Sequence, residues 1–335
     1  MLYQLRIFLG KSFAFVLAML LSLPVHSQQV ENSSSSVTSF LISIQPDIKL
    51  EIVEWGGEGE PVVFLAGLGH TAHVFDEFAP RFCDRFRVLG MTRRGHGLSS
   101  KPETGYDLAT LAEDIRIVLD SLKIERAILA GHSVGGDEMT KFASTYPDRI
   151  RALVYIEAAY DRISTRDTLT NYPDPESTIL TPTDDDYASA AAFLDYYEKA
   201  NGVRWPVSEV HALYNVEPDG KIGNYVIPGY VYGGINNALE HPDYSRIDVP
   251  ALAIYGVDYP ITELYSDYET RDTIDQARMR LRYGICRKMD AASRQTFMTE
   301  MKKGKVAEVM GAGHSLYLTH AEDAARIMHN FLDEF

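Results

Sequence analysis

Cysteine is nearly absent from this chain of 335 residues, which contains only Cys83 and Cys286. Two isolated cysteines cannot form a disulfide framework, and they are too few for a cysteine-based structural zinc site. A single disulfide is conceivable in an exported protein. However, the segments that contain the two residues are expected on opposite faces of the sheet predicted below, so we expect both thiols to be free.

Positive charge is also scarce, since 32 lysines and arginines oppose 47 aspartates and glutamates, for a formal net charge of −15. Basic residues form nothing longer than pairs such as Arg93-Arg94 and Lys302-Lys303. An acidic chain without a basic cluster is not expected to bind nucleic acid or anionic membrane surfaces. The partner that we expect is a small-molecule substrate, and the composition leaves the oligomeric state open.

Long apolar runs are missing apart from one near the start of the chain. Within residues 1–27, Arg6 and Lys11 precede an uncharged apolar run from Phe13 to Val25, and small residues lie at a cleavage position near Ser27. The run is shorter than the ~20 residues of a membrane-spanning helix. It therefore predicts a signal peptide, export to the periplasm or the extracellular space, and no stable membrane anchoring after cleavage.

Nucleotide and metal motifs are lacking too. The glycine-rich stretch from Gly56 to Gly59 precedes a predicted strand rather than a helix, which is the wrong context for a phosphate loop. We see no cluster with metal-ligand spacing, and we expect neither a metal nor a cofactor.

Short apolar strands alternate with helical patterns along most of the chain, as in the amphipathic segment Leu108–Leu122 and the apolar spacing of Phe75–Phe82. This alternation predicts an α/β fold with a mostly parallel central sheet, right-handed crossovers and helices on both faces. The predicted strands are residues 39–44, 49–55, 62–66, 87–91, 127–130, 152–156, 250–256 and 306–310.

The pattern changes between residues 161 and 246, where strong apolar strands are missing and tyrosines are frequent. We interpret this segment as a helical cap inserted into a core formed by residues 38–160 and 247–335. The serine-rich residues 28–37 are interpreted as a flexible leader. Aromatic residues of the cap either line a substrate pocket or form the interior of the cap.

The sequence Gly131-His132-Ser133-Val134-Gly135 stands between an apolar strand and a helix-forming segment. In this context G-x-S-x-G predicts a sharp, strained turn that exposes a nucleophilic serine, here Ser133. The two glycines leave room where strand and helix approach each other closely. The helix start directs backbone N–H groups toward negative charge that develops beside the hydroxyl.

Four features in a fixed order resemble the α/β-hydrolase family over nearly the whole mature chain. They are the Gly67-Leu68-Gly69 turn, the loop from Arg94 to Ser99, the serine elbow, and Gly311-Ala312-Gly313-His314 before the last helix. The resemblance implies that Ser133 is the nucleophile and His314 the general base. It also implies an oxyanion hole made by the backbone N–H groups of Leu68 and Val134.

The resemblance leaves two rival positions for the acid of the triad. Asp258 follows the strand that ends near Gly256, where most family members have their acid, although it lies one residue closer to the glycine than usual. Glu157 follows the strand after the nucleophile helix, where some members, including haloalkane dehalogenases and a fungal lactonase type, have theirs. A carboxylate that interrupts an apolar strand is costly unless it is paired, which counts for Glu157, but family members that do not use an acid at this position also carry one there. Both positions therefore stay open.

Three other histidines lie near these motifs. His132 is expected to pack beside the nucleophile, His96 to hold its own loop, and His70, beside the oxyanion turn, is a candidate for contact with substrate.

A serine nucleophile disfavours dehalogenase and epoxide hydrolase chemistry, in which relatives use an aspartate. Acyl transfer to water through an acyl-enzyme on Ser133, as in an esterase or lactonase acting on an apolar or aromatic substrate, is the leading hypothesis. The alternatives are another chemistry of the family, such as carbon–carbon bond hydrolysis, peracid formation or prolyl aminopeptidase activity, and a ligand receptor that has kept the fold.

Overall fold

The computed structural model describes residues 37–175 and 181–335. The predicted signal peptide, residues 1–27, and all of the predicted leader except Val37 lie outside the described residues. Over the described ranges, we find no helix that is long and apolar enough to span a membrane.

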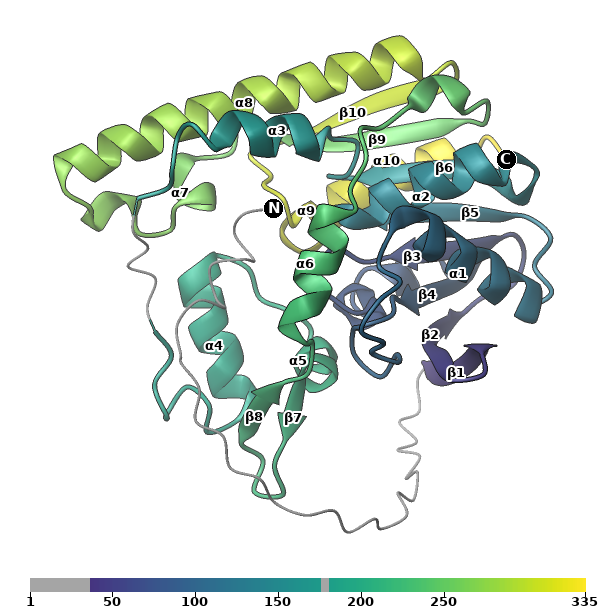
Figure 1. Ribbon diagram of the computed structural model, residues 1–335, viewed down its shortest axis with the longest axis horizontal. Coiled ribbons are helices and arrows are strands. Elements are labelled where there is room, and N and C mark those ends of the chain that lie inside the picture. Colours follow the sequence, from purple (N-terminus) through teal and green to yellow (C-terminus); the bar gives the residue numbers. More distant parts are fainter. Residues whose placement is uncertain (1–36, 176–180) are drawn as a thin grey trace.

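An eight-stranded sheet forms the centre of the protein, in the order β1-β2-β4-β3-β5-β6-β9-β10 (Figure 1). The first two strands form an antiparallel hairpin, β2 is antiparallel to β4, and every other neighbouring pair is parallel. The predicted α/β fold with a mostly parallel sheet is therefore confirmed. The strands are β1 (Thr38–Gln45), β2 (Ile48–Gly56), β3 (Pro61–Leu65), β4 (Arg87–Thr92), β5 (Ala127–His132), β6 (Ile150–Ile156), β9 (Ala251–Val257) and β10 (Gly304–Met310).

Helices cover both faces of the sheet because alternate strand residues point to opposite sides and are apolar on both. One face packs against α1 (Leu108–Ser121), α2 (Val134–Thr145) and the end of α8 (Thr273–Glu300). The other packs against α10 (Ala321–Leu332), the short α9 (Leu316–Thr319) and two 3₁₀ turns, η2 (Ala72–Phe75) and η3 (Ala79–Phe82).

These 3₁₀ turns correct the expected helix over residues 75–82. Pro80 lies in the first turn of η3, so the chain starts a new turn there instead of continuing one helix. Phe75, Phe78 and Phe82 still bury their rings against Phe64 of β3, with centroid distances of 5.1, 6.1 and 5.9 Å. The apolar spacing therefore identified the buried face correctly but not the type of helix.

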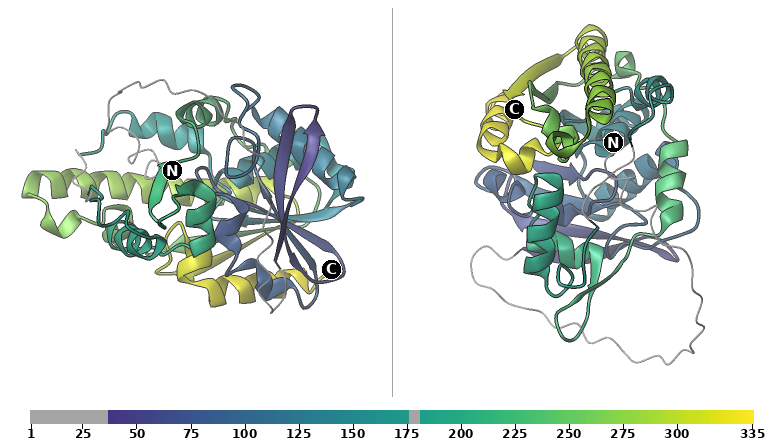
Figure 2. Two further views of the ribbon diagram at one scale, coloured as in Figure 1. Left: turned by 90° about the horizontal axis from the view of Figure 1, so that it is seen from below. Right: turned by 90° about the vertical axis from the view of Figure 1, so that its left-hand side faces the viewer.

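Between β6 and β9 the chain leaves the sheet and forms a separate layer at its carboxyl edge (Figures 1 and 2). Its aromatic and aliphatic side chains form an apolar cluster of their own, which also includes Leu68, Tyr106 and Val134 of the sheet domain. A small antiparallel hairpin lies here that the sequence did not indicate. The elements of this layer are α4 (Ala190–Asn201), α5 (Val207–Leu213), β7 (Tyr214–Val216), β8 (Ile222–Tyr225) and α6 (Gly229–Asn237). The same connection contains α3 (Arg162–Leu169), which lies beside α8 (Figure 1), and η5 (Tyr244–Arg246), whose Tyr244 packs in the core of the sheet domain.

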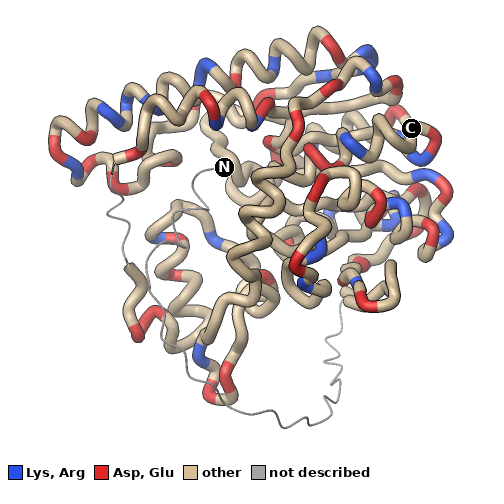
Figure 3. The backbone as a smooth tube through the Cα atoms, viewed as in Figure 1, with Lys and Arg blue, Asp and Glu red and all other residues tan. Residues whose placement is uncertain are grey.

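Helix α8 extends past the sheet toward this inserted layer, and the short helix α7 (Ile261–Leu264) and the turn η6 (Tyr268–Thr270) precede it (Figures 1 and 2). Helix α8 carries charges of both signs, with more basic than acidic residues (Figure 3). Near its start, Arg271 pairs with Asp267 and Asp275 at distances of 2.8 and 3.3 Å. Cys286 on α8 and Cys83 after η3 are both free thiols, as expected.

Glycine at position 135 is required by the contact between α2 and β3. A Cβ atom there would lie 2.4 Å from the backbone oxygen of Leu65. We expect Gly135→Ala to lower the free energy of unfolding by about 2–3 kcal/mol, since backbone atoms must move to relieve the overlap. Gly284→Ala, within α8, should raise it by about 0.5–1 kcal/mol, because a Cβ atom there meets nothing within 4 Å. Urea unfolding measures both, and equal effects would contradict this account.

Candidate active site

Ser133 occupies the sharp turn between β5 and α2. Its backbone has φ 52° and ψ −124°, a strained conformation for a residue with a side chain. The turn is tight enough that a Cβ atom at Gly131 would lie 2.7 Å from the backbone of Gly135. The strand–turn–helix context predicted from G-x-S-x-G is therefore present, and the first residue of α2 is Val134.

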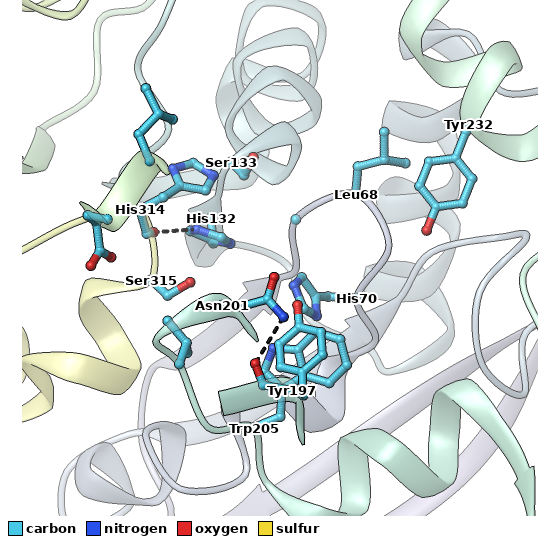
Figure 4. Close-up of a pocket in the computed structure, with 14 residues that line it drawn as sticks. Leu68, His70, His132, Ser133, Tyr197, Asn201, Trp205, Tyr232, His314 and Ser315 are labelled. Carbon is cyan, nitrogen blue, oxygen red and sulfur yellow. Dashed lines mark hydrogen bonds between the residues drawn. The ribbon is translucent and has the colours of Figure 1, made fainter. Parts of the chain in front are cut away.

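His314 lies in the loop between β10 and α9, and it lines the same cavity as Ser133 (Figure 4). Its backbone carbonyl accepts a hydrogen bond from Nε2 of His132, at 2.9 Å. Burial lowers the pKa of His132 well below its ordinary value, so this ring stays neutral and donates from Nε2. His132 was expected only to pack, whereas it also fixes the loop that contains His314.

Glu157 and Asp258, the two rival acids, occupy very different surroundings. Oε2 of Glu157 lies 3.4 Å from Nδ1 of His314, and the Glu157 side chain is 7% exposed. The Asp258 side chain is 65% exposed and pairs with Arg287 at 2.6 Å. Both residues have positive φ, 49° and 54°, directly after β6 and β9. The structure thus brings Glu157 to His314 and directs Asp258 to an ion pair at the surface.

The Glu157 carboxylate is held by hydrogen bonds from two sides. The backbone N–H of Gly256 donates to Oε1 at 2.5 Å, and the hydroxyl of Tyr160 donates to Oε2 at 2.9 Å. Burial nevertheless raises the pKa of Glu157 to about 7, because these bonds offset only part of the lost hydration. Burial, with the nearby Glu157 charge as a second cause, also raises the pKa of Asp290 to about 6.

Arg93 holds the turn that contains Leu68, the first predicted oxyanion-hole residue. Its guanidinium donates to the backbone oxygens of Ala66 at 2.7 Å and Gly67 at 3.1 Å, and it also pairs with Glu138 of α2. Because Arg93 binds both the turn carbonyls and Glu138, it fixes the position of the turn relative to α2, the helix that starts at Val134. Sequence reasoning missed this role, because an arginine in a loop carries no signal of burial.

His96 and His70 both contact the same turn. Nε2 of His96 accepts a hydrogen bond from the backbone N–H of Gly69 at 3.2 Å, and its Nδ1 binds the carbonyl of Arg94 at 3.1 Å. His96 therefore holds its own loop, as expected, and ties it to the oxyanion turn. His70 is buried, and its Nδ1 lies 2.9 Å from Oε1 of Glu209 in the inserted layer.

Two cavities meet at His314. The smaller, about 120 Å³, opens onto Ser133 and is lined by apolar and aromatic side chains, among them Leu68, Tyr197, Val203, Trp205 and Tyr232, and by a similar number of polar ones. The larger, about 300 Å³, lies on the Glu157 side and is lined by more polar groups. Glu263, Leu264 and His314 line both. Within residues 37–175 and 181–335, no group of three or more His, Cys, Asp or Glu side chains is arranged to hold a metal ion.

Residues 60–281 match the alpha/beta hydrolase fold family, and the chain therefore belongs to this family. This result confirms the resemblance inferred from the four motifs. The relatives described next are named as a hydrolase, a chloroperoxidase and a lactone-degrading enzyme.

Curated relatives match parts of the chain. A 2-(acetamidomethylene)succinate hydrolase from Mesorhizobium japonicum is 40% identical over 101 residues, which are 30% of this chain and 36% of that protein. A non-heme chloroperoxidase from Streptomyces lividans is 30% identical over 220 residues, 61% of this chain and 76% of that protein. The first of these matches thus spans little more than a third of its relative.

Solved structures share the fold over most of the chain. The crystal structure of E-2-(acetamidomethylene)succinate hydrolase superposes with a TM-score of 0.64 at 23% identity, covering 89% of this chain and all of that one. Est816, described as an N-acyl homoserine lactone degrading enzyme, superposes with a TM-score of 0.56 at 18% identity, covering 87% and 99%. At these identities the likeness shows the fold alone.

The two rival acids are distinguished by a matched pair of substitutions. We expect Glu157→Gln to lower kcat by about 10³–10⁴-fold, because the amide does not stabilise the imidazolium that forms when His314 takes the serine proton. Asp258→Asn should change kcat by less than about twofold, since it removes only an exposed ion pair. Steady-state kinetics measures both, and the reverse order would assign the acid to Asp258.

The raised pKa of Glu157 predicts opposite effects of pH on stability and activity. From about pH 4.5 to 7 the folded protein keeps a proton that the unfolded chain has lost, so the free energy of unfolding falls as pH rises. The shift corresponds to about 3 kcal/mol. Activity should rise over the same range, because His314 needs an ionised partner.

Urea unfolding at pH 5 and pH 8 tests the stability effect. Glu157→Gln should reduce the difference in the free energy of unfolding between the two pH values by about 3 kcal/mol. Asp258→Asn should leave this difference as it is in the unmodified protein. Parallel pH dependences for Glu157→Gln and the unmodified protein would show that Glu157 does not titrate in this range.

Proposed function

We propose that this protein is an exported serine hydrolase that cleaves a carboxylic ester or lactone through an acyl-enzyme on Ser133. The observation that supports this most directly is the convergence of Ser133, His314 and Glu157 at one edge of the sheet. Serine hydroxyls become effective nucleophiles when an imidazole accepts their proton and a carboxylate orients that imidazole. Export rests on the composition of residues 1–27.

The proposed reaction has two stages. In the first, Oγ of Ser133 attacks the substrate carbonyl, His314 takes the hydroxyl proton, and the backbone N–H groups of Leu68 and Val134 stabilise the oxyanion. The C–O bond to the leaving group then breaks, and His314 gives its proton to the departing oxygen. In the second stage water attacks the acyl-enzyme by the same steps and releases the carboxylic acid and free Ser133.

The cavity beside Ser133 favours a small acyl group. Its volume of about 120 Å³ holds few non-hydrogen atoms, and its lining of Leu68, Tyr197, Trp205 and Tyr232 offers mainly apolar surface. The larger cavity on the far side of His314 is the place for the remaining part of the substrate. A relative of the same fold is named for degrading N-acyl homoserine lactones, which agrees with an ester or lactone substrate.

Carbon–carbon bond hydrolysis is the alternative activity, because it uses a serine, a histidine and an acid in the same fold. Peracid formation is a further outcome, since two curated relatives are named as non-heme haloperoxidase or chloroperoxidase. Carbon–carbon bond hydrolysis differs from the proposal in the bond that breaks, and peracid formation differs in the nucleophile, hydrogen peroxide in place of water, that attacks the acyl-enzyme. Substrate assays with and without hydrogen peroxide therefore separate them.

A fluorophosphonate tests the nucleophile directly, because it reacts with serines that a neighbouring base activates. We expect intact-mass spectrometry to show one adduct, mapped to Ser133, and hydrolysis of 4-nitrophenyl butanoate. Ser133→Ala should abolish both, and His314→Ala should lower the esterase activity by at least about 10³-fold.

The same samples show whether a negative result is informative. Circular dichroism confirms that each variant is folded. A folded protein that forms no adduct and hydrolyses no ester would contradict the proposal and favour a ligand receptor. An adduct without ester hydrolysis would direct the search to carbon–carbon bond substrates.

A further inference from the structure

Arg93 places a buried positive charge against the backbone of the oxyanion turn. Its guanidinium donates from Nη2 to the carbonyl of Ala66 at 2.7 Å and from Nη1 to the carbonyl of Gly67 at 3.1 Å. Nε of the same group pairs with Glu138 of α2. The Arg93 side chain is 3% exposed and does not line the cavity beside Ser133. Arg93 can therefore influence a reaction in this cavity only through the groups that it binds.

The bond to the Gly67 carbonyl fixes the direction of the Leu68 N–H group. The two groups belong to one peptide unit, and they point in opposite directions because the peptide bonds of the described residues are all trans. With the carbonyl on Arg93, the N–H points away from Arg93. The same oxygen also accepts from the backbone N–H of His70 at 3.2 Å, which closes the turn, and Arg93 adds the charge. In the described part of the chain, the Leu68 N–H has no hydrogen-bond acceptor.

The same peptide unit lies beside the nucleophile. A Cβ atom at Gly67 would lie 3.1 Å from Cβ of Ser133, so the backbone of the turn passes next to the serine side chain. Gly67, Leu68 and Ser133 all line the smaller cavity (Figure 4). Negative charge on a carbonyl that Ser133 attacks therefore develops close to this peptide unit.

The charge of Arg93 also affects how strongly the Leu68 N–H donates. Electrons are shared across a peptide unit, which gives its C–N bond partial double-bond character. A cationic donor on the carbonyl oxygen draws electron density toward that oxygen and leaves the N–H more positive, since linked hydrogen bonds polarise one another. The effect is largest in a buried site, where water screens the charge least.

We infer that Arg93 is a positioning residue of the oxyanion hole: it orients the Gly67–Leu68 peptide with its N–H toward Ser133 and strengthens that N–H as a donor. The inference rests on the proposed hydrolase function and deepens it, because part of the stabilisation of the transition state comes from a side chain that does not touch substrate. Glu138 keeps the guanidinium in place from α2. An arginine with a structural role alone would not discriminate between the oxyanion and the uncharged substrate.

A second buried ion pair in the same loop supplies a matched control. Arg94 follows Arg93 and binds both carboxylate oxygens of Asp114, at 2.7 and 2.6 Å. Among the described residues, its side chain forms no bond to the oxyanion turn. Replacing one partner alone would leave a buried charge, so both partners are replaced. The test variant is Arg93→Met/Glu138→Leu and the control is Arg94→Met/Asp114→Leu, and only the first loses bonds to the turn.

The substrate is 4-nitrophenyl butanoate, and the probe of the oxyanion hole is 1,1,1-trifluoropentan-2-one, which has the same acyl chain. Oγ of Ser133 adds to the carbonyl carbon of the ketone, His314 takes the hydroxyl proton, and the carbonyl oxygen becomes an oxyanion. We expect the Arg93 double variant to lower kcat about 10²-fold, the low end of the effect of losing an oxyanion-hole donor.

The inhibition constant of the ketone should rise by a similar factor, about 10²-fold, because its adduct carries the same oxyanion. KM should change less than about threefold, since the ground-state ester carries no negative charge. The Arg94 double variant should change kcat, KM and the inhibition constant less than about threefold each.

Arg93→Lys and Arg94→Lys repeat the comparison with the charge retained, and they keep the test decisive if a double variant does not fold. A lysine ammonium cannot bind two carbonyls and a carboxylate in the planar arrangement of a guanidinium. We expect Arg93→Lys to lower kcat and the affinity for the ketone about tenfold, and Arg94→Lys to change both less than about threefold. Circular dichroism confirms that each variant is folded.

The outcomes separate this inference from the proposed function. Turnover that requires Ser133, with Arg93 variants that lose no more kcat and ketone affinity than the Arg94 variants, would overturn the inference alone. If the unmodified protein shows no ester turnover that requires Ser133, the proposed function is contradicted and the inference falls with it.

Discussion

The sharp turn at Ser133 is the constraint on which the rest of the site depends. With φ at 52°, the chain passes from β5 directly into α2, so the helix lies close against the sheet. Gly131 and Gly135 are needed because their missing side chains let strand and helix meet. The serine is thereby raised above the carboxyl edge of the sheet, and only groups at that edge can reach it.

Buried carboxylates connect the surrounding elements to this edge. Glu138 on α2 binds Arg93, which holds the oxyanion turn, and Glu209 on α5 binds the residues that follow that turn. Burying such groups costs free energy of hydration, and paired charges in the interior contribute little net stability. Their effect is on position instead, because each accepts hydrogen bonds from a specific loop and excludes other arrangements.

The two pairs of imidazole and carboxylate differ in their separation and in their exposure to solvent. Glu157 lies 3.4 Å from a His314 side chain that is 41% exposed, whereas Glu209 lies 2.9 Å from the buried ring of His70. A general base must accept and release protons as the reaction proceeds, and catalytic hydrogen bonds are often long before substrate binds. The bonds of Glu209 to His70 and Thr71 instead connect the inserted layer to the loop that follows the Gly67-Leu68-Gly69 turn.

Local sequence was sufficient for the fold and for part of the site. Apolar runs of strand length marked the strands of the sheet, and the glycines around Ser133 and before His314 marked the turns, because these signals depend on neighbouring residues alone. The choice between Glu157 and Asp258 was open, since both follow strands of the same sheet. The roles of Arg93, His132 and Glu209 were not visible, because their partners lie 26 to 182 positions away in the chain. Short-range order follows from periodicity and turn chemistry, whereas the pairing of distant side chains depends on how strands, loops and the inserted layer pack in space.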